Sequence, residues 1–449
     1  MKPGKSITSL CLGILLASCQ GDTQLAEGGI TGSGITMGPI TAFGSVWVGG
    51  VRYDVSNAQF LRNGLIEPLG QNAFRVGEIV NIVGDINQDG VTGVAKRVEF
   101  DRNLSGLVTA KSTDGKTLYV LGQAVETDTL TLFSGFSSLS TLETGNVVEI
   151  SGSRTPAGTW IASTISLLQS GFVDGKSELE VEGRISTVKT DEQTFKVGEL
   201  TVNYSQSILN NVGDLSQAAG QFIEIKSEKN LVNGQLLADI IEPDDEYPQF
   251  AADSFTTLDG RITEFSNSDV FSVNGQAVLI TENTKLVNGD KTDFGLNAHL
   301  SIEGYINSNR ILEANEVTVR QSADQDKSIT LEAKIELIDA ENASLTLLGS
   351  EIITDTSTII LDYNQTEGLP INFEKLLVGN LIRVTGRKIT DGKIIALRID
   401  RNPPKQTQPE TPPNGQDSED TDSGTDNGSD SGTDNETDPG TDNETDPGT

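Results

Sequence analysis

The chain has 449 residues and a formal net charge of −33, from 65 Asp and Glu against 32 Lys and Arg. A nucleic-acid backbone is bound by clustered Lys and Arg, and no such cluster is present, so we expect no nucleic-acid partner. The only cysteines are Cys11 and Cys19 and the only histidine is His299, which argues against thiolate or multi-histidine metal sites and Ser-His-Asp catalysis. We therefore expect no cofactor and no catalytic residue.

Residues 1–18 have the pattern of a secretory signal. Lys2 and Lys5 precede an apolar stretch over 10–16 that is too short to span a bilayer. The following Leu-Ala-Ser-Cys19 resembles a bacterial lipobox, which implies cleavage before Cys19 and lipid attachment to it. Gln20, by resemblance to proteobacterial lipoproteins, favours the outer membrane. We therefore expect a lipid-anchored protein of the bacterial cell envelope, facing the periplasm or the cell surface; the alternative is a plain signal peptide cut near Ala17.

Residues 19–37 are predicted to be a glycine-rich tether. The segment contains Gly28-Gly-Ile-Thr-Gly-Ser-Gly34 but no preceding strand, so it does not have the context of a phosphate-binding loop. It leads into the first copy of a repeated unit.

A sequence pattern recurs five times between residues 38 and 400. Each copy opens with a small residue before Ile or Leu, continues through a glycine-centred turn and an alternating apolar run, and closes on Ala-x-x-Val or Ala-x-x-Ile. The openings lie 68 to 77 positions apart, which is the size of a small domain. The predicted domains are residues 38–101, 105–169, 181–242, 257–320 and 331–400.

Within each copy the apolar residues alternate with the period of β-strands. About five short strands, apolar on one side only, bury a core if the sheet curls on itself, so we predict an all-β chain of five tandem OB-like barrels. The last two strands are expected to form a hairpin, preceded by a less regular stretch with a third strand and one helical turn. Each copy is expected to have its own core, formed in the fifth by Leu345, Leu347, Ile382, Val384, Ile394 and Ala396.

The opening of the first copy carries a resemblance to a known family. Residues 38–54 read Gly-Pro-Ile-Thr-Ala-Phe-Gly-Ser-Val-Trp-Val-Gly-Gly-Val-Arg-Tyr-Asp, after the glycine-rich segment and the lipobox. Together they resemble bacterial lipoproteins with tandem copies of the domain of unknown function 5666. The resemblance covers residues 28 to about 400 and is strongest in the first copy and weakest in the third and fourth. It implies small β-barrels in tandem, and the family has no established activity from which to transfer catalytic residues.

One turn of the first copy is a weak calcium candidate. Asp85, Asn87 and Asp89, followed by Gly90, have the spacing of the first calcium ligands in an EF-hand loop. However, Lys96 stands where that loop requires Glu, and the segment falls between the last two strands, where Asn, Asp and Gly suit a hairpin turn. We favour the turn and expect no metal site.

Three further residues are candidate binding groups. His299 lies in an alternating run, which predicts a partly buried barrel histidine. Trp47 and Trp160 lie in strand patterns, with Trp47 facing opposite to its valine neighbours. An exposed Trp can stack on a sugar or peptide, but packing against the next domain is favoured because large aromatic residues are usually buried.

Residues 401–449 are predicted to be a disordered acidic tail. Positions 417–446 hold twelve Asp and Glu and no Lys or Arg, with almost no apolar residues to bury. We interpret the tail as a solvated spacer; weak calcium collection is the alternative.

Together these features predict a non-catalytic envelope protein that acts as a binding or spacer module for an envelope protein or carbohydrate. The alternative is a carboxylate-dependent enzyme, or an accessory subunit, acting on envelope polysaccharide. That alternative requires a cleft walled by aromatic residues with two carboxylates about 5 to 9.5 Å apart. No such pair is recognisable from the spacing of acidic residues in the sequence.

Overall fold

The computed structural model describes residues 32–246, 248–364, 368–389 and 392–404. The signal segment with Cys19 and the acidic tail from residue 405 lie outside these ranges. The described residues form β-strands joined by turns and single turns of 3-10 helix, which confirms the predicted all-β class.

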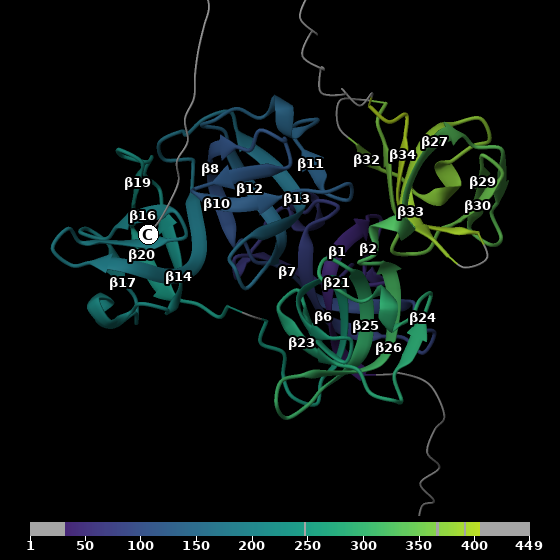
Figure 1. Cartoon of the computed structure of the whole chain (residues 1–449), viewed down its shortest axis with the longest axis horizontal. Coiled ribbons are helices and arrows are strands. Elements are labelled where there is room, and N and C mark those ends of the chain that lie inside the picture. Colours follow the sequence, from purple (N-terminus) through teal and green to yellow (C-terminus); the bar gives the residue numbers. More distant parts are fainter. Residues whose placement is uncertain (1–31, 247, 365–367, 390–391, 405–449) are drawn as a thin grey trace, which may run out of the picture. The chain divides into compact units, whose positions relative to one another are not determined.

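The first repeat is a closed five-stranded barrel (Figure 1). The first three strands form an antiparallel meander, the third pairs in parallel with the fifth, and the fourth joins the fifth to the first. This closed order, 1-2-3-5-4-1, is that of the OB barrel and leaves no free edge. The strands are β1 (Gly32–Ala42), β2 (Val46–Val48), β3 (Val51–Asp54), β6 (Ile79–Ile86) and β7 (Thr92–Phe100). Residues 32–37, predicted as part of the tether, are therefore the first half of β1, where they pair with β6.

The second and fourth repeats have the same strand order. The second consists of β8 (Leu104–Lys111), β9 (Thr117–Val120), β10 (Gln123–Glu126), β12 (Val147–Arg154) and β13 (Trp160–Gln169). The fourth consists of β21 (Phe255–Asn267), β22 (Val270–Val273), β23 (Gln276–Leu279), β25 (His299–Ile306) and β26 (Leu312–Gln321).

The third and fifth repeats keep this order but each has one interrupted strand. In the third repeat the last strand is divided in two, and one part pairs with the third strand while the other pairs with the fourth. In the fifth repeat the first strand is divided in two, and one part pairs with the fourth strand while the other pairs with the second. The third consists of β14 (Leu179–Lys189), β15 (Thr194–Val197), β16 (Leu200–Asn203), β18 (Phe222–Ser227), β19 (Gln235–Leu237) and β20 (Ile240–Pro243). The fifth consists of β27 (Ser328–Lys334), β28 (Leu337–Asp339), β29 (Ser344–Leu347), β30 (Ser350–Ile353), β33 (Leu381–Lys388) and β34 (Ile394–Arg401).

The predicted irregular stretch before the final hairpin is present in every repeat. It holds a single 3-10 turn, as expected. The third strand of the barrel, expected within this stretch, precedes it instead, and the short strand found there is an additional one that runs parallel to the last strand. The short strands are β4 (Gln59–Arg62), β11 (Leu132–Ser134), β17 (Ile208–Leu209), β24 (Lys285–Val287) and β31 (Ile359–Asp362). The 3-10 turns are η1 (Gly70–Ala73), η2 (Leu139–Thr141), η3 (Leu215–Gln217), η4 (Lys291–Asp293) and η6 (Phe373–Lys375).

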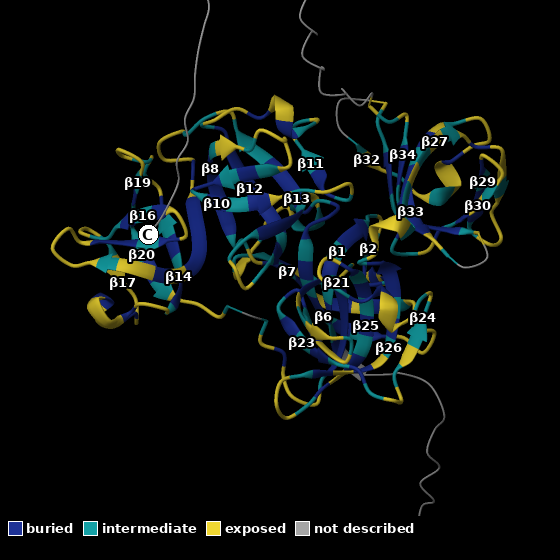
Figure 2. Ribbon diagram, in the orientation of Figure 1, coloured by how far each residue is buried: buried dark blue, intermediate teal, exposed yellow. Residues whose placement is uncertain are grey.

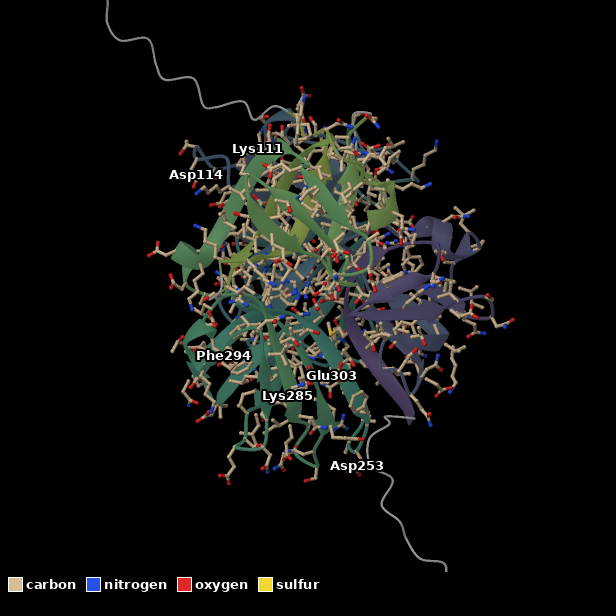
Figure 3. The ribbon with its side chains drawn as sticks, turned by 90° about the vertical axis from the view of Figure 1, so that its right-hand side faces the viewer. Lys111, Asp114, Asp253, Lys285, Phe294 and Glu303 are labelled. Carbon is tan, nitrogen blue, oxygen red and sulfur yellow. The ribbon has the colours of Figure 1, made fainter. Side chains whose placement is uncertain are left out.

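Alternation along the strands separates a buried core from a charged outer surface. The six core residues predicted for the fifth repeat are all buried. Figure 2 shows buried positions along the strands and exposed positions concentrated in the turns. In the fourth repeat Phe294 belongs to the core, whereas Lys285 and Glu303 lie on the outer side of the strands (Figure 3).

A steric arrangement that recurs between repeats explains the repeated Gly and Ala of the sequence pattern. In four repeats the penultimate strand contains a glycine at a β-bulge, where a Cβ would lie only 2.0 to 2.4 Å from a carbonyl oxygen of the last strand. The residue paired with this glycine is the alanine that opens the closing Ala-x-x-Val or Ala-x-x-Ile. The pairs are Gly84 with Ala95, Gly152 with Ala162, Gly304 with Ala314, and Gly386 with Ala396. The third repeat has Ser227 instead of the glycine, and its last strand is the interrupted one.

The repeats are interlocked rather than strung as separate beads. Strand β1 pairs in parallel with β21, and β8 pairs antiparallel with β14. The second and third repeats share one continuous hydrophobic cluster, so the prediction that every copy has a separate core is wrong for these two. The physical reason is that the first strands of both repeats lie side by side, and their apolar faces continue into one another.

The end of the last strand sets where the acidic tail can be removed. The Arg401 guanidinium pairs with Asp362, Asn402 donates its backbone N–H to the Leu381 carbonyl, and the Pro404 carbonyl accepts from Arg383. We expect truncation after Pro404 to leave the thermal unfolding midpoint unchanged, because residues beyond it have almost nothing apolar to bury. Truncation after Asp400 should lower the midpoint, because it removes the contacts of Arg401, Asn402 and Pro404. Differential scanning calorimetry measures the midpoints of both truncated proteins. A fall of several degrees after the Pro404 truncation would show that the tail docks on the barrels.

Candidate ligand-binding cleft

A cavity of about 510 Å³ lies where four repeats meet, and we call it the acidic cleft. Cavities of this size accommodate small organic ligands. Among the residues that line it are Asn81, Arg97 and Glu99 of the first repeat; Asp101, Arg102 and Asn103 of the following linker; Arg154 and Trp160 of the second repeat; Glu180, Glu182, Phe222, Glu224 and Lys226 of the third; and Asp244, Glu246 and Phe250 of the linker before the fourth.

The carboxylates of the third repeat come from the outer faces of two adjacent strands. Along β14, Leu179 and Val181 point into the core. Glu180 lies between them and Glu182 follows Val181, so both glutamates point outward. In the antiparallel pairing, Glu182 lies opposite Glu224 and Glu180 lies opposite Lys226. The outer face of this barrel, which is ordinarily solvated, is here covered by neighbouring repeats, so the carboxylates are buried.

Burial and mutual contact change the ionisation of this group. Burial, together with a hydrogen bond to Glu224, raises the pKa of Glu180 to about 9. No N–H group in the described residues donates to Glu180 Oε1, and the hydrogen bond between Glu180 and Glu224 requires a proton on one of the two carboxyl groups. For Glu224, burial alone would raise the pKa, but the hydrogen bonds with Glu180 and Lys226 outweigh it and lower the pKa. The pair therefore titrates as a unit.

A second set of carboxyl groups behaves in the same way. Burial, and then the charge of Asp244, raises the pKa of Glu182 well above its usual value. Burial, followed by the charge of Glu99, raises the pKa of Asp101 to about 6. Burial also raises the pKa of Asp244. At neutral pH the cleft therefore holds protons on some of its carboxyl groups because too many carboxylates share a poorly solvated space.

Arginine side chains hold the walls of the cleft together. Arg102 forms ion pairs with Glu149 at 2.8 Å, with Glu178 at 3.1 Å and with Glu180 at 3.4 Å. Through these pairs the linker after the first repeat is fixed to both the second and the third. Because Glu149 is also paired with Arg62 of the first repeat, the carboxylates at the edge of the cleft link three repeats.

Aromatic residues form the apolar part of the lining. Trp160, Phe222 and Phe250 are buried, and the Arg154 guanidinium lies 5.3 Å from the centre of the Phe222 ring. The Trp160 Nε1–H has no acceptor in the part of the chain that the structure describes. Burial of Trp160 agrees with the packing interpretation, and Trp47, as predicted, is the partly exposed residue between two buried valines.

The second cavity, of about 70 Å³, contains the only histidine. His299 Nε2 lies 2.6 Å from Asp259 Oδ1, while His299 Nδ1 and Asp259 Oδ2 have no partner among the described residues. His299 is partly buried, as predicted, but it lies on the outer side of the barrel because the neighbouring Leu300 is in the core. This cavity has room for a few water molecules.

The weak calcium candidate has the hydrogen bonds of a hairpin turn. Asp85 pairs with Lys96, and Asn87 donates to the Thr92 hydroxyl at 2.7 Å. Asp89 accepts from the Thr92 hydroxyl and from backbone N–H groups, and these bonds lower its pKa. The three side chains are thus directed to partners within the turn. The lipidation residue Cys19 lies outside the described residues.

Within the described residues, no group of three or more His, Cys, Asp and Glu is placed to hold a metal ion. They also include no helix of the length and apolarity needed to cross a bilayer.

Sequence reasoning missed the acidic cleft. The available signal was the run Glu178-Leu-Glu180-Val-Glu182, which places three glutamates on one face of a strand. A sequence pattern contains no information on which strand of another repeat covers that face, so the run by itself indicates only an outward-facing strand surface.

The family described as Domain of unknown function (DUF5666) matches residues 105–166, 182–242, 259–318 and 332–400. These four segments together make up more than half of the chain. The chain belongs to the DUF5666 family. The matched DUF5666 segments are the second to fifth repeats, so the expectation that the resemblance is strongest in the first repeat is wrong. The first repeat nevertheless has the same closed strand order.

Other comparisons add little to this DUF5666 assignment. No curated protein matches the chain. One solved structure to which it is similar is drosophila Unr CSD456, at 12% identity, covering 49% of this chain and 96% of that chain with a TM-score of 0.15. Because a TM-score this low means that the two chains do not superpose as wholes, the OB-like description rests on the strand order of the repeats.

Proposed function

We propose that this DUF5666 protein is a non-catalytic, lipid-anchored protein of the bacterial cell envelope that binds an envelope partner in the acidic cleft. The observation that carries the proposal is the cleft itself, a ligand-sized cavity whose walls come from four repeats and two linkers. Such a site requires the repeats to be assembled, which gives the tandem arrangement a purpose beyond spacing. The partner is an envelope protein or carbohydrate.

Substitution of Asn81 tests the binding role. This side chain lines the cleft from the outer face of β6, so Asn81→Trp should fill part of the cavity without entering a core. Capture of envelope material by the lipidated full chain should fall at least tenfold, whereas Asn309→Trp, in an exposed turn, should have no effect. Equal capture by all three proteins would refute binding in the cleft.

The proposed anchor at Cys19 is tested separately. Cys19→Ser should move the protein from the membrane fraction into the soluble envelope fraction, because acyl chains contribute about 0.8 kcal/mol per buried methylene. Fractionation and immunoblotting measure the distribution. Unchanged membrane retention would contradict the lipoprotein hypothesis.

A carboxylate-dependent enzyme acting on polysaccharide is the alternative function. Carboxyl groups that share a proton, such as Glu180 and Glu224, are closer together than the roughly 5 to 5.5 Å that a retaining glycosidase requires. Their contact therefore supports binding over hydrolysis. Release of reducing sugar from envelope polysaccharide by the wild-type protein, and its loss in Glu180→Gln, would favour the enzyme.

A further inference from the structure

We propose that the acidic cleft binds an organic cation with primary ammonium groups on an alkyl chain, such as a polyamine or a lysine-like side chain. This inference rests on the proposed function, because it names the ligand class of the same site. Three properties of the cleft carry it: an excess of carboxylates, buried acceptors without donors, and an apolar wall.

The first property is charge. The cleft is lined by eight Asp and Glu but only four Lys and Arg. The bases are already engaged: Arg102 with Glu149, Arg154 with Glu246 and Lys226 with Glu224. Among the described residues, Glu182 and Asp244 have no Lys or Arg within ion-pair distance. The cleft is therefore short of positive charge.

The second property is an acceptor without a donor. Glu180 is 2% exposed, and its Oε1 accepts from no N–H or O–H group in the described residues. The other oxygen, Oε2, pairs with Arg102 at 3.4 Å, so Oε1 is the buried half of the carboxyl group that a proton or a further cation must satisfy. An ammonium group provides three donors and a full positive charge, so it can replace the shared proton between Glu180 and Glu224.

The third property selects an alkylamine over a metal ion. The described carboxylates are not grouped to coordinate a metal, whereas an ammonium group needs only acceptors at hydrogen-bond distance. Trp160 and Phe222 offer aromatic surface on which methylene groups pack, and an aromatic face also attracts a cation. Several ammonium groups on one chain match carboxylates that are spread along two strands.

Binding of the ammonium ligand is expected to release a proton from the cleft. The ligand enters as an ammonium ion, the proton held between Glu180 and Glu224 leaves to solvent, and the ammonium hydrogens bond the two carboxylates. Affinity should therefore rise with pH between about 6 and 9, and each bound ammonium should release up to one proton.

Calorimetry with spermidine tests the inference on the full chain. Titrations in two buffers of different ionisation enthalpy give affinity and proton release. We expect proton release by the wild type, and a loss of both proton release and at least tenfold of affinity in Glu180→Gln, whose amide imitates the protonated carboxyl. Glu182→Gln is a second variant, should the first fail to fold. Glu143→Gln, an exposed residue away from the cleft, removes the same charge and should bind as the wild type does.

The outcomes separate this inference from the proposed function. Equal affinity and equal proton release in wild type, Glu180→Gln and Glu182→Gln would place spermidine outside the cleft and overturn the inference. If Asn81→Trp abolishes envelope capture while spermidine does not compete with that capture, the cleft binds a partner of other chemistry: the proposed function stands and the amine proposal falls. Tighter binding of Ca²⁺ than of spermidine, with the same dependence on Glu180, would also overturn it.

Discussion

Val384→Asp is expected to unfold the fifth repeat while the first four keep their fold. Val384 is fully buried in a cluster formed by this repeat, and an unpaired carboxylate there costs several kcal/mol, comparable to the whole stability of a domain of about 65 residues. Hydrogen exchange followed by peptide mass spectrometry should show loss of protection over residues 328–401. Peptides of the other repeats should stay protected.

The fourth repeat is one neighbour expected to respond, and the first repeat, whose core cluster includes Leu361 of the fifth, is another. Arg320 of β26 is buried and pairs with Asp355 of the fifth repeat, and Arg387 of the fifth donates to the Val319 carbonyl at 3.1 Å. Unfolding of the fifth repeat should therefore raise exchange near Arg320 without abolishing protection of β25. Val378→Asp, at an exposed position of the same repeat, is the control and should leave exchange unchanged. Simultaneous loss of protection in all five repeats would show that the chain is one cooperative unit.

Raising the pH from about 5 to 9 is expected to lower the stability of the wild-type protein. Glu180 and Asp101 have folded-state pKa values of about 9 and about 6, above the 4.5 and 3.8 of the free groups. A raised pKa gives stability that is fully present below the unfolded value and is lost as the pH rises through the folded value. For each retained proton, the free energy of unfolding falls by up to about 1.4 kcal/mol per pH unit between the unfolded and the folded pKa.

The acid side of the profile has the opposite slope. A hydrogen bond from Arg401 lowers the pKa of Asp362, so stability from this group is present above the unfolded value and is lost as the pH falls through the folded value. The unfolding midpoint should therefore be highest near pH 5. Differential scanning calorimetry across pH 2 to 9 measures the profile.

Glu180→Gln isolates the cleft from other titrating groups. Because the amide imitates the protonated carboxyl, the variant should match the wild type at pH 5 and be more stable at pH 9, whereas Glu143→Gln should keep the wild-type slope. Identical profiles for wild type and Glu180→Gln would mean that Glu180 is ionised in the folded protein at neutral pH.

Local patterns in the sequence predicted the barrels well. Alternation with period two identifies strands because successive side chains point to opposite faces, and it selected Leu345, Val384 and Ile394 as core residues. The Gly and Ala that recur as a pair in four repeats also have a local cause, since the glycine at each bulge faces the carbonyl of the strand next to it. These features are set within about 65 residues of chain.

The cleft was not predictable in the same way. The outward direction of Glu180 and Glu182 follows from alternation, but an outward carboxylate is solvated and unremarkable unless something covers it. Whether these carboxylates are covered depends on the pairing of β8 with β14 and on the position of the linkers. Both bring together residues that are distant in sequence. For Asp85, Asn87 and Asp89, the spacing left calcium open beside the favoured hairpin turn, and only the structure shows that these side chains are directed to Lys96 and Thr92.

By itself, then, the sequence determined the strand period, the five repeats, six buried residues of the fifth barrel and the excess of acidic charge, because all of these depend on neighbouring residues along the chain. Only the tertiary structure decided that the barrels interlock, that the second and third share a core and that carboxylates from β14 and β18 are enclosed with protons between them. The reason is physical: burial of a charge depends on everything that surrounds it in space, and the groups that surround Glu180 come from three repeats.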